Sequence, residues 1–270
     1  MIRQRPPLQG APASEPPGQM AELWLTSWAL LRRHTGFYLG LAALLASAEA
    51  MLRAIDPAAS GTIVPWVLVA YSLHRLLLLG EDGTKATRRE GAPGPAVWLF
   101  LSVTLGLLLL SMIGPFAALA WGIARVDMRG VDPTLLVEAF FLASGALHGL
   151  VLAGLGTALP AAAVRDRCGL RLTLSRGRRT AGMVLLGFLV GPAAGGLILT
   201  AAAASLAQWW EPFRLSLEPR WLGEVLGVLA LWPLQLARLL NATLMAVVLC
   251  RAYRTVAPPG ILAVLAPYPR

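Results

Sequence analysis

The chain has 270 residues, of which 57% are hydrophobic and 14% are charged, whereas a typical soluble protein has about 45–50% and about 25%. This composition excludes an ordinary soluble domain and predicts a single membrane domain. The net charge of +9 would suggest nucleic acid as the partner of a soluble protein. Here the cations lie in short loops and at the ends of apolar segments, so we expect contacts with anionic lipid headgroups and no nucleic acid.

Six apolar segments follow one another along the chain, and most reach the roughly 20 residues that a helix needs to cross a bilayer core of about 30 Å. They lie near residues 36–52, 62–79, 96–124, 135–164, 182–206 and 221–249. Most of the 23 Lys and Arg residues lie in or beside the N-terminus, the second and fourth loops and the C-terminus; the exceptions are Arg53, Arg125, Arg129, Arg214, Arg220 and Arg238. The positive-inside rule then places both termini in the cytoplasm. The expected fold class is therefore all-α, a polytopic bundle of six transmembrane helices with amphipathic interfacial helices.

The two ends of the chain are expected to lie outside the bundle. Residues 1–19 are Pro-rich and polar with no apolar stretch, which predicts a disordered cytoplasmic tail rather than a secretory signal. The membrane domain is expected over residues 20–257, and residues 258–270 are expected to form a second cytoplasmic tail. Lys85 is the only Lys, and together with the abundant Ala, Gly and Leu it indicates a high-GC bacterial genome. The predicted location is therefore the bacterial inner membrane.

Two basic segments precede apolar helices. In residues 20–34, one helical face can carry Leu23, Trp24, Ser27, Leu30 and Leu31, which predicts an interfacial helix with Trp24 and Trp28 at headgroup depth. The alternative is a cytoplasmic extension of the first transmembrane helix. The second basic segment covers residues 165–180. One interpretation of the cations in the two segments is that they contact anionic lipids, and the other is that they only enforce topology. The candidate lipid contacts are Arg32, Arg33, Arg165, Arg167, Arg171, Arg176, Arg178 and Arg179.

Three stretches carry a resemblance to a known family. They are TSWALLRRHTGFYLG at residues 26–40, LPAAAVRDR at residues 159–167 leading into LSRGRRT at 174–180, and LCRAYR at 249–254. The chain resembles the YciC-like proteins and is similar to the membrane domain attached to some glycerophosphoryl diester phosphodiesterases. The resemblance implies a six-helix bundle but no catalytic residue, because the phosphodiesterase chemistry belongs to a separate soluble domain. The loop at residues 80–95 departs from the family.

Small residues in the fourth and fifth segments indicate close helix packing. Gly145 and Gly149 are separated by three residues, as are Gly187 and Gly191, and Gly191 and Gly195, so each pair lies on one helix face and lets two backbones approach. We expect these glycine faces to pack the two helices against each other, against a membrane-protein partner or against a second copy of the chain. The prolines expected to bend their helices are Pro115, Pro160, Pro192 and Pro233.

Polar side chains inside the apolar segments form the candidate site. In the sixth segment, one helix face carries Glu224, Gln235, Arg238 and Asn241. If the fourth helix is a neighbour, Glu138 and His148 complete a buried cluster. Its functional interpretation is a proton or anion pathway in which His148 titrates and Arg238 holds an anion.

A structural interpretation of the same residues stays open. Glu138 and Glu224 lie near the outer ends of their helices and would reach water, Arg238 would snorkel beside Asn241, and His148 would make one interhelical hydrogen bond. The ionisable residues at the ends of other segments are interpreted as interfacial anchors; these are Glu49, His74 and Arg75.

No catalytic or metal-binding pattern stands out. The sequence holds no Gly-x-Ser-x-Gly elbow, no His-Glu-x-x-His motif and no phosphate-binding glycine loop followed by Lys. The histidines are scattered, and Cys168 and Cys250 both fall on the predicted cytoplasmic side, where thiols stay reduced. We therefore expect no enzyme activity, metal or cofactor. The predicted role is an accessory, scaffold or assembly component of a membrane protein complex; the alternatives are a small-solute or proton-linked transporter and a lipid-processing enzyme.

Overall fold

The computed structural model describes residues 18–55, 63–89, 94–125, 133–166, 169–216 and 218–265, and these residues form helices and turns without a strand. The helices, in chain order, are α1 (Gly18–Arg33), α2 (Thr35–Ile55), α3 (Ile63–Arg89), α4 (Pro95–Arg125), α5 (Pro133–Leu155), α6 (Ala158–Ala163), α7 (Leu170–Phe188), the π-helical turn η2 (Leu189–Ala193), α8 (Ala194–Leu215), α9 (Arg220–Val256) and α10 (Pro259–Leu262). The predicted tail at residues 1–19 falls almost entirely outside the described residues.

Five apolar stretches within these helices are long enough to cross a membrane: Thr35–Leu52, Pro95–Ala118, Thr134–Leu155, Leu170–Leu199 and Val225–Val256. The all-helical membrane architecture is thereby confirmed. The second predicted span is shorter, since its apolar part covers only Pro65–Gly80. Gly80 ends this part of α3 because its backbone is not helical, with φ of 66° and ψ of −158°, a conformation with positive φ that is essentially restricted to glycine.

Two predicted span boundaries are wrong. The fourth predicted span, residues 135–164, ends early because α5 stops at Leu155 and a turn leads into the short helix α6. Pro160 is tolerated there because it lies in the first turn of α6, where its missing N–H has no helical partner in any case. The fifth predicted span, residues 182–206, begins too late. Its helix starts at Leu170, so most of the basic segment belongs to α7.

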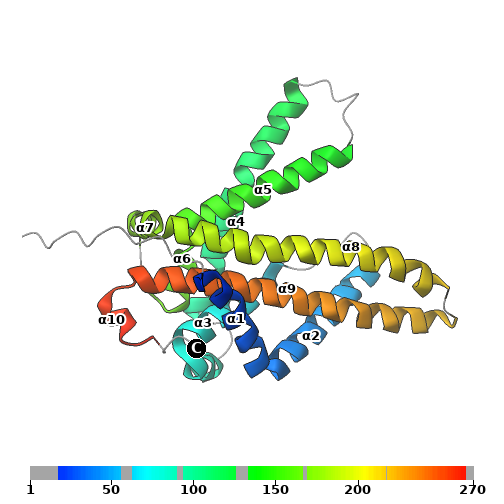
Figure 1. Ribbon diagram of the computed structural model, residues 1–270, viewed down its shortest axis with the longest axis horizontal. Coiled ribbons are helices and arrows are strands. Elements are labelled where there is room, and N and C mark those ends of the chain that lie inside the picture. The colour runs from blue at the N-terminus through cyan, green and yellow to red at the C-terminus, as the bar shows by residue number, and fades with distance from the viewer. Residues whose placement is uncertain are drawn as a thin grey trace, which may run out of the picture.

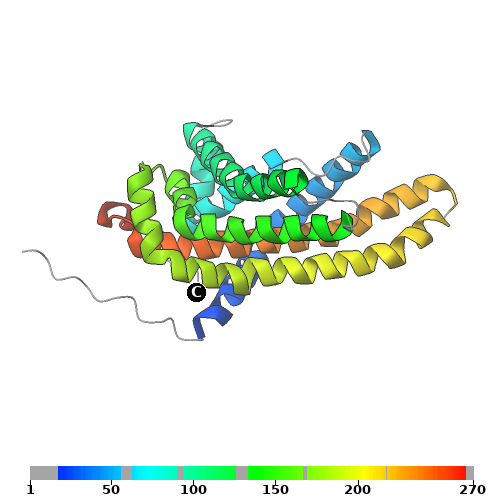
Figure 2. The same cartoon turned by 90° about the horizontal axis from the view of Figure 1, so that it is seen from above.

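Helix α9 is the centre of the fold, and α1, α2, α3, α7 and α8 all pack against it (Figures 1 and 2). Its C-terminal half is enclosed on all sides, because Leu244, Val247, Leu249, Cys250 and Tyr253 are each at most 1% exposed. The N-terminal half of α9 runs beside α8 toward the opposite end of the molecule (Figure 2). The best-packed part of the protein is therefore the end where α3, α6 and α7 meet α9.

Helix α1 is a separate element that lies across α9 and η2. The chain turns at His34 between α1 and α2, and the two helices meet at a sharp angle (Figure 1), so the alternative of a straight extension is wrong. The predicted apolar face is confirmed, because Leu23, Ser27 and Leu30 are buried. The Trp24 indole N–H donates to the Val190 carbonyl oxygen in η2 at 3.3 Å. This face is therefore covered by protein.

The glycines of α5 and α7 allow a very close crossing of these two helices. A Cβ built on Gly177 of α7 would lie 1.7 Å from the carbonyl oxygen of Gly154 in α5, and one on Gly149 would lie 2.8 Å from the Phe188 ring. Only glycine can occupy position 177 at this separation. The expected packing of the fourth and fifth helices against each other is present, although Gly154 and Gly177 carry its closest point.

The other predicted glycine face meets α9. A Cβ on Gly187 would lie 3.0 Å from Val248, one on Gly191 would lie 3.8 Å from Leu244, and one on Gly195 would lie 2.8 Å from Asn241 Oδ1. Residue Gly191 belongs to η2, where Pro192 interrupts the α-helical hydrogen-bond ladder. This face is therefore occupied within the chain itself.

Helices α4 and α5 form a hairpin whose distal part leans away from α8 and α9 (Figure 1). Near its base α4 packs on α3 and α6, and α5 packs on α7. Farther out the two helices pack on each other, as shown by the edge-to-face rings of Phe116 and Phe140, 5.2 Å apart. Large apolar side chains on the outer surface of this hairpin are exposed, namely Leu109, Ile113, Phe116, Leu135 and Leu142.

Candidate functional site: an arginine beside a cavity in the helix bundle

A buried carboxylate in α2 holds two polar side chains of α9. Glu49 Oε2 accepts a hydrogen bond from Arg238 Nη1 at 3.0 Å and another from Gln235 Nε2. The two donors lie on one face of α9 because they are three residues apart. The Glu49 side chain is only 6% exposed. The interpretation of Glu49 as an interfacial anchor is therefore wrong, since it pairs with the predicted site residues in the bundle interior.

The position of Arg238 makes a partner necessary. It lies near the middle of the apolar stretch Val225–Val256, where a cation costs about 2.5–3.5 kcal/mol on insertion scales. Glu49 offsets this cost by charge pairing and one hydrogen bond. A second polar contact joins α2 to α9 nearer the buried end, where the hydroxyl groups of Tyr38 and Thr243 lie 2.9 Å apart. The α2–α9 interface is thus fixed by polar contacts at two levels.

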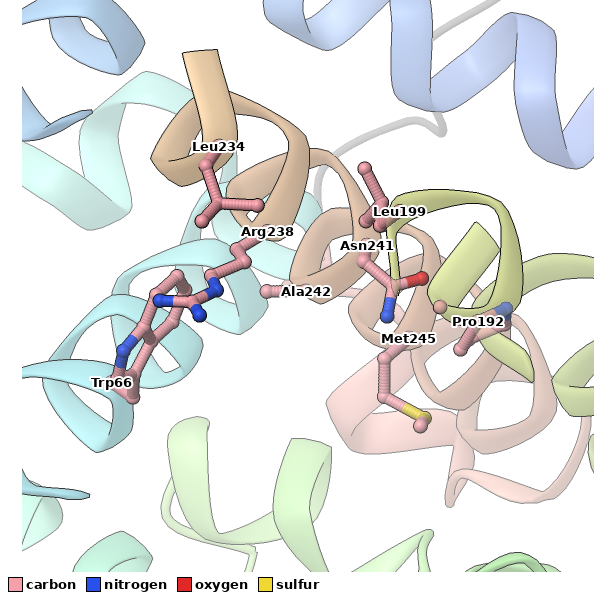
Figure 3. A pocket seen from close by; sticks show the side chains of 9 residues that line it. Trp66, Pro192, Leu199, Leu234, Arg238, Asn241, Ala242 and Met245 are labelled. Carbon is pink, nitrogen blue, oxygen red and sulfur yellow. The ribbon is translucent and has the colours of Figure 1, made fainter. Parts of the chain in front are cut away.

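A cavity of about 560 Å³ lies beside Arg238 between α3, the η2–α8 bend and α9. Figure 3 shows its walls, with Arg238 and Trp66 on one side and Asn241, Met245 and Pro192 on the other. The remaining lining residues are Gly196, Leu199, Leu234 and Ala242. The volume falls in the range of about 300–1,000 Å³ that is typical of small-molecule sites.

The polar side chains on the wall offer hydrogen-bond donors. The Arg238 side chain is 42% exposed although its Nη1 is bonded to Glu49, and a guanidinium carries five N–H groups and no acceptor. The Asn241 amide nitrogen is directed into the space in Figure 3, whereas its Oδ1 is buried without a hydrogen-bond partner. Trp66 adds an indole that can only donate. No carboxylate is among the residues that line the cavity.

The six residues expected to form one cluster are not brought together. His148 of α5 lies 3.3 Å from the Ser111 hydroxyl of α4, and Glu138 is exposed on α5. Helix α5 packs on α4 and α7, whereas Gln235, Arg238 and Asn241 of α9 face α2 and the cavity. The side chain of Glu224 lies outside the described residues. A pathway that joins His148 to Arg238 is therefore not assembled in this structure.

A second polar centre ties the basic segment to the end of α9. Asp166 Oδ2 accepts hydrogen bonds from Arg176 Nη1 at 2.7 Å and from the Tyr253 hydroxyl at 2.8 Å. The Arg176 guanidinium also lies over the Tyr253 ring, 5.7 Å from its centre. The Arg176 side chain is only 8% exposed. Arg176 is therefore committed inside the protein, and its interpretation as a lipid contact is wrong.

The other cations predicted to contact lipids lie on the protein surface wherever the structure describes them. Six of them are exposed, namely Arg32, Arg33, Arg165, Arg171, Arg178 and Arg179, and Arg167 lies outside the described residues. His74 and Arg75 are buried in α3, where Arg75 Nη1 donates to the Tyr71 hydroxyl at 2.8 Å. The interpretation of these two residues as interfacial anchors is wrong, because both side chains are buried and the His74 ring packs on Phe100 of α4.

Sequence reasoning missed Glu49 and Asp166 as partners. A signal for Glu49 was present, since it is an ionisable residue inside an apolar segment and such residues face the bundle interior and pair. Asp166 gave no such signal because it lies in a basic loop. Within the described part of the chain, no three His, Cys, Asp or Glu side chains are grouped as metal ligands would be.

The comparisons with known proteins add no assignment. No family model, no curated protein and no solved structure matches this chain. The YciC-like resemblance therefore stays a prediction.

Proposed function

We propose that the chain is a non-catalytic accessory or assembly component of a bacterial inner-membrane complex, and that it binds another membrane protein through the α4–α5 hairpin. The observation that carries the proposal is the hairpin itself, which leans away from the bundle (Figure 1) and whose two helices pack on each other through Phe116 and Phe140. A two-helix arm has little buried surface of its own. A third helix supplied by a partner would complete it.

The exposed surface of the hairpin supports this role. Ile113 of α4 is 62% exposed and Leu142 of α5 is 70% exposed, and a Cβ on Gly145, one turn from Leu142, would meet nothing within 4 Å. Small residues beside large apolar ones let a helix from another protein approach closely. The glycine face of Gly187, Gly191 and Gly195 is occupied by α9, so we place the partner contact on the hairpin instead.

The proposed orientation puts both termini in the cytoplasm. Helix α7 lies at the same end of the bundle as α10 and the C-terminal end of α9 (Figures 1 and 2). It carries three exposed arginines, Arg171, Arg178 and Arg179. By the positive-inside rule this is the cytoplasmic end. Protease protection of a C-terminal epitope in right-side-out membrane vesicles, with digestion in inverted vesicles, is the expected result.

Photo-crosslinking in native membranes tests the partner contact. A photoreactive amino acid is placed at Ile113 or Leu142, and matched controls are placed at Leu197 or Ile198 of α8, which are 69% and 65% exposed. We expect discrete protein adducts from the hairpin positions and none from α8. An adduct of twice the chain's own mass would identify the partner as a second copy of the chain. Adducts to lipid alone at all four positions would overturn the proposal.

A further inference from the structure

We propose that the cavity beside Arg238 binds the ring of an isoprenoid quinone, whose two carbonyl oxygens accept hydrogen bonds from opposite walls. The site is separate from the α4–α5 hairpin, so the inference does not depend on a protein partner. Three features carry it. The cavity lies at the depth of the hydrocarbon, the charge of its arginine is balanced, and its polar side chains donate from two sides.

The depth of the cavity limits which membrane molecules can reach it. The centre of the apolar stretch Val225–Val256 falls between Leu240 and Asn241, so Asn241 and Arg238 lie within about 4 Å of it at about 1.5 Å per residue. Phospholipid headgroups lie outside a hydrocarbon core about 30 Å thick, and so at least about 15 Å from its centre. A headgroup is therefore too far away, whereas the uncharged ring of a quinone dissolves within the hydrocarbon.

The charge of the wall favours an uncharged ligand. Glu49 pairs with Arg238 at 3.0 Å, and the other residues that line the cavity are all uncharged. An anion would lose its hydration here and meet an arginine whose charge is already balanced. A quinone carbonyl in the hydrocarbon has neither water nor a donor, so a hydrogen bond from the wall is a net gain over the lipid phase. Hydrogen bonding, rather than apolar burial, therefore selects the ligand.

The donors lie on two sides of the cavity, which matches a ring with carbonyl groups on opposite edges. Arg238 donates to Glu49 through Nη1, and its partly exposed guanidinium lies beside the Trp66 indole at the cavity (Figure 3). Asn241 directs its amide nitrogen into the space from the other side (Figure 3). Both residues keep N–H groups for a ligand, because a guanidinium has five of them and an amide has two.

The wall offers no free acceptor. Among the side chains that line the cavity, the one oxygen is Asn241 Oδ1, which is buried against α8, where a Cβ on Gly195 would lie 2.8 Å from it. The hydroxyl protons of a reduced quinol would find no oxygen to accept them, and an unpaired polar group away from water costs about 1–3 kcal/mol. The site should therefore prefer the oxidised quinone to the quinol.

The size and the apolar part of the wall fit a ring better than water. An apolar cavity of about 150 Å³ holds one benzene molecule, so about 560 Å³ has room for a substituted ring and the first part of its tail. Water filling this volume would amount to roughly twenty molecules at about 30 Å³ each, every one in need of about 2–4 polar partners. Most of the wall is apolar and includes Leu199, Leu234 and Met245.

The test measures ligand affinity by isothermal titration calorimetry on the full chain purified in a neutral maltoside detergent. The probes are decylubiquinone, its reduced form decylubiquinol, and decylbenzene, which has a ring and the same alkyl tail but no acceptor. We expect a single decylubiquinone per chain, bound about tenfold or more tightly than either of the other probes, because each of them loses hydrogen bonds with the wall.

Two variants remove the donors of one wall at a time. Asn241→Leu keeps the size of the side chain and the Glu49–Arg238 pair, and its affinity for decylubiquinone should fall about fivefold, as for one neutral hydrogen bond. Glu49→Gln/Arg238→Met removes both charges together and leaves no unpaired ion, and the affinity should fall by about tenfold or more. The matched control is Leu197→Ala on the exposed surface of α8, which should bind as the wild type does.

A further variant guards against misfolding of the double variant. A Cβ on Gly196 would lie 3.8 Å from the Asn241 amide nitrogen, an ordinary contact, so Gly196→Leu fills the cavity without changing the ion pair. This variant should not bind decylubiquinone.

Five results would overturn the proposal. Decylbenzene bound as tightly as decylubiquinone would mean apolar filling alone, and decylubiquinol bound as tightly would mean that the wall offers an acceptor. Wild-type affinity in all three cavity variants would place the quinone elsewhere, and its loss in Leu197→Ala would place it on the outer surface of α8. A wild-type chain that binds none of the probes would leave the cavity to water or lipid chains. None of these results affects the partner contact proposed for the hairpin.

Discussion

Replacing Gly177 by Ala should destabilise the fold because the α5–α7 crossing has no room for a methyl group. The added Cβ would lie 1.7 Å from the Gly154 carbonyl oxygen, whereas ordinary contact begins at 3.4 Å. The two backbones must therefore separate by about 1.7 Å at this point. A gap of only about 0.5–1 Å already removes a quarter to a half of the dispersion energy of each contact. Overpacking of this kind costs about 3 kcal/mol.

Gly182→Ala on the same helix is the matched control, because a Cβ there would meet nothing within 4 Å. Both variants gain about 1 kcal/mol in helix propensity, so the difference between their free energies of unfolding reports the crossing alone. We expect Gly177→Ala to be less stable than Gly182→Ala by about 3 kcal/mol, measured by chemical unfolding in detergent and followed by far-ultraviolet circular dichroism. Equal stabilities within about 0.5 kcal/mol would refute the close crossing.

Three further changes test the polar and buried contacts. Tyr38→Phe removes the hydrogen bond to Thr243 and should cost about 1 kcal/mol of unfolding free energy; an unchanged stability would mean that the bond is not made. Asp166→Ala leaves the buried Arg176 guanidinium without its carboxylate and should cost about 3–5 kcal/mol, whereas retention of wild-type stability would contradict the buried pair. In a variant that lacks Cys168, the remaining Cys250 is fully buried in α9 and should resist maleimide labelling until denaturant is added. Rapid labelling of the folded protein would show that this end of α9 is open.

The helices themselves followed from local sequence. Apolar length and the apolar helical face of residues 20–34 predicted elements that the structure contains, because each depends on residues within a few turns of one another. The boundaries were less secure. Leu155 ends α5 although the apolar run continues, since Pro160 and the packing of α6 against α4 decide where the chain turns.

The candidate site was only half visible in the sequence. Arg238 and Asn241 stood out as polar residues in an apolar segment, and helical spacing placed them on one face. Glu49, the partner of Arg238, lies 189 residues away from it in the chain, and no local pattern pairs the two residues. The expected neighbour was the helix of His148, but that residue meets Ser111 instead, because α5 packs on α4.

The sequence by itself determined that this protein is helical and built for a membrane, since hydrophobic length and charge placement depend only on local composition. The tertiary structure alone decided which helices touch. It brought α2 rather than α5 to the polar face of α9, closed α5 onto α7 through Gly154 and Gly177, and left a cavity beside Arg238. The physical reason is that two helices pack where their surfaces fit each other. Small residues and buried ion pairs define such a fit only when both helix surfaces are considered together.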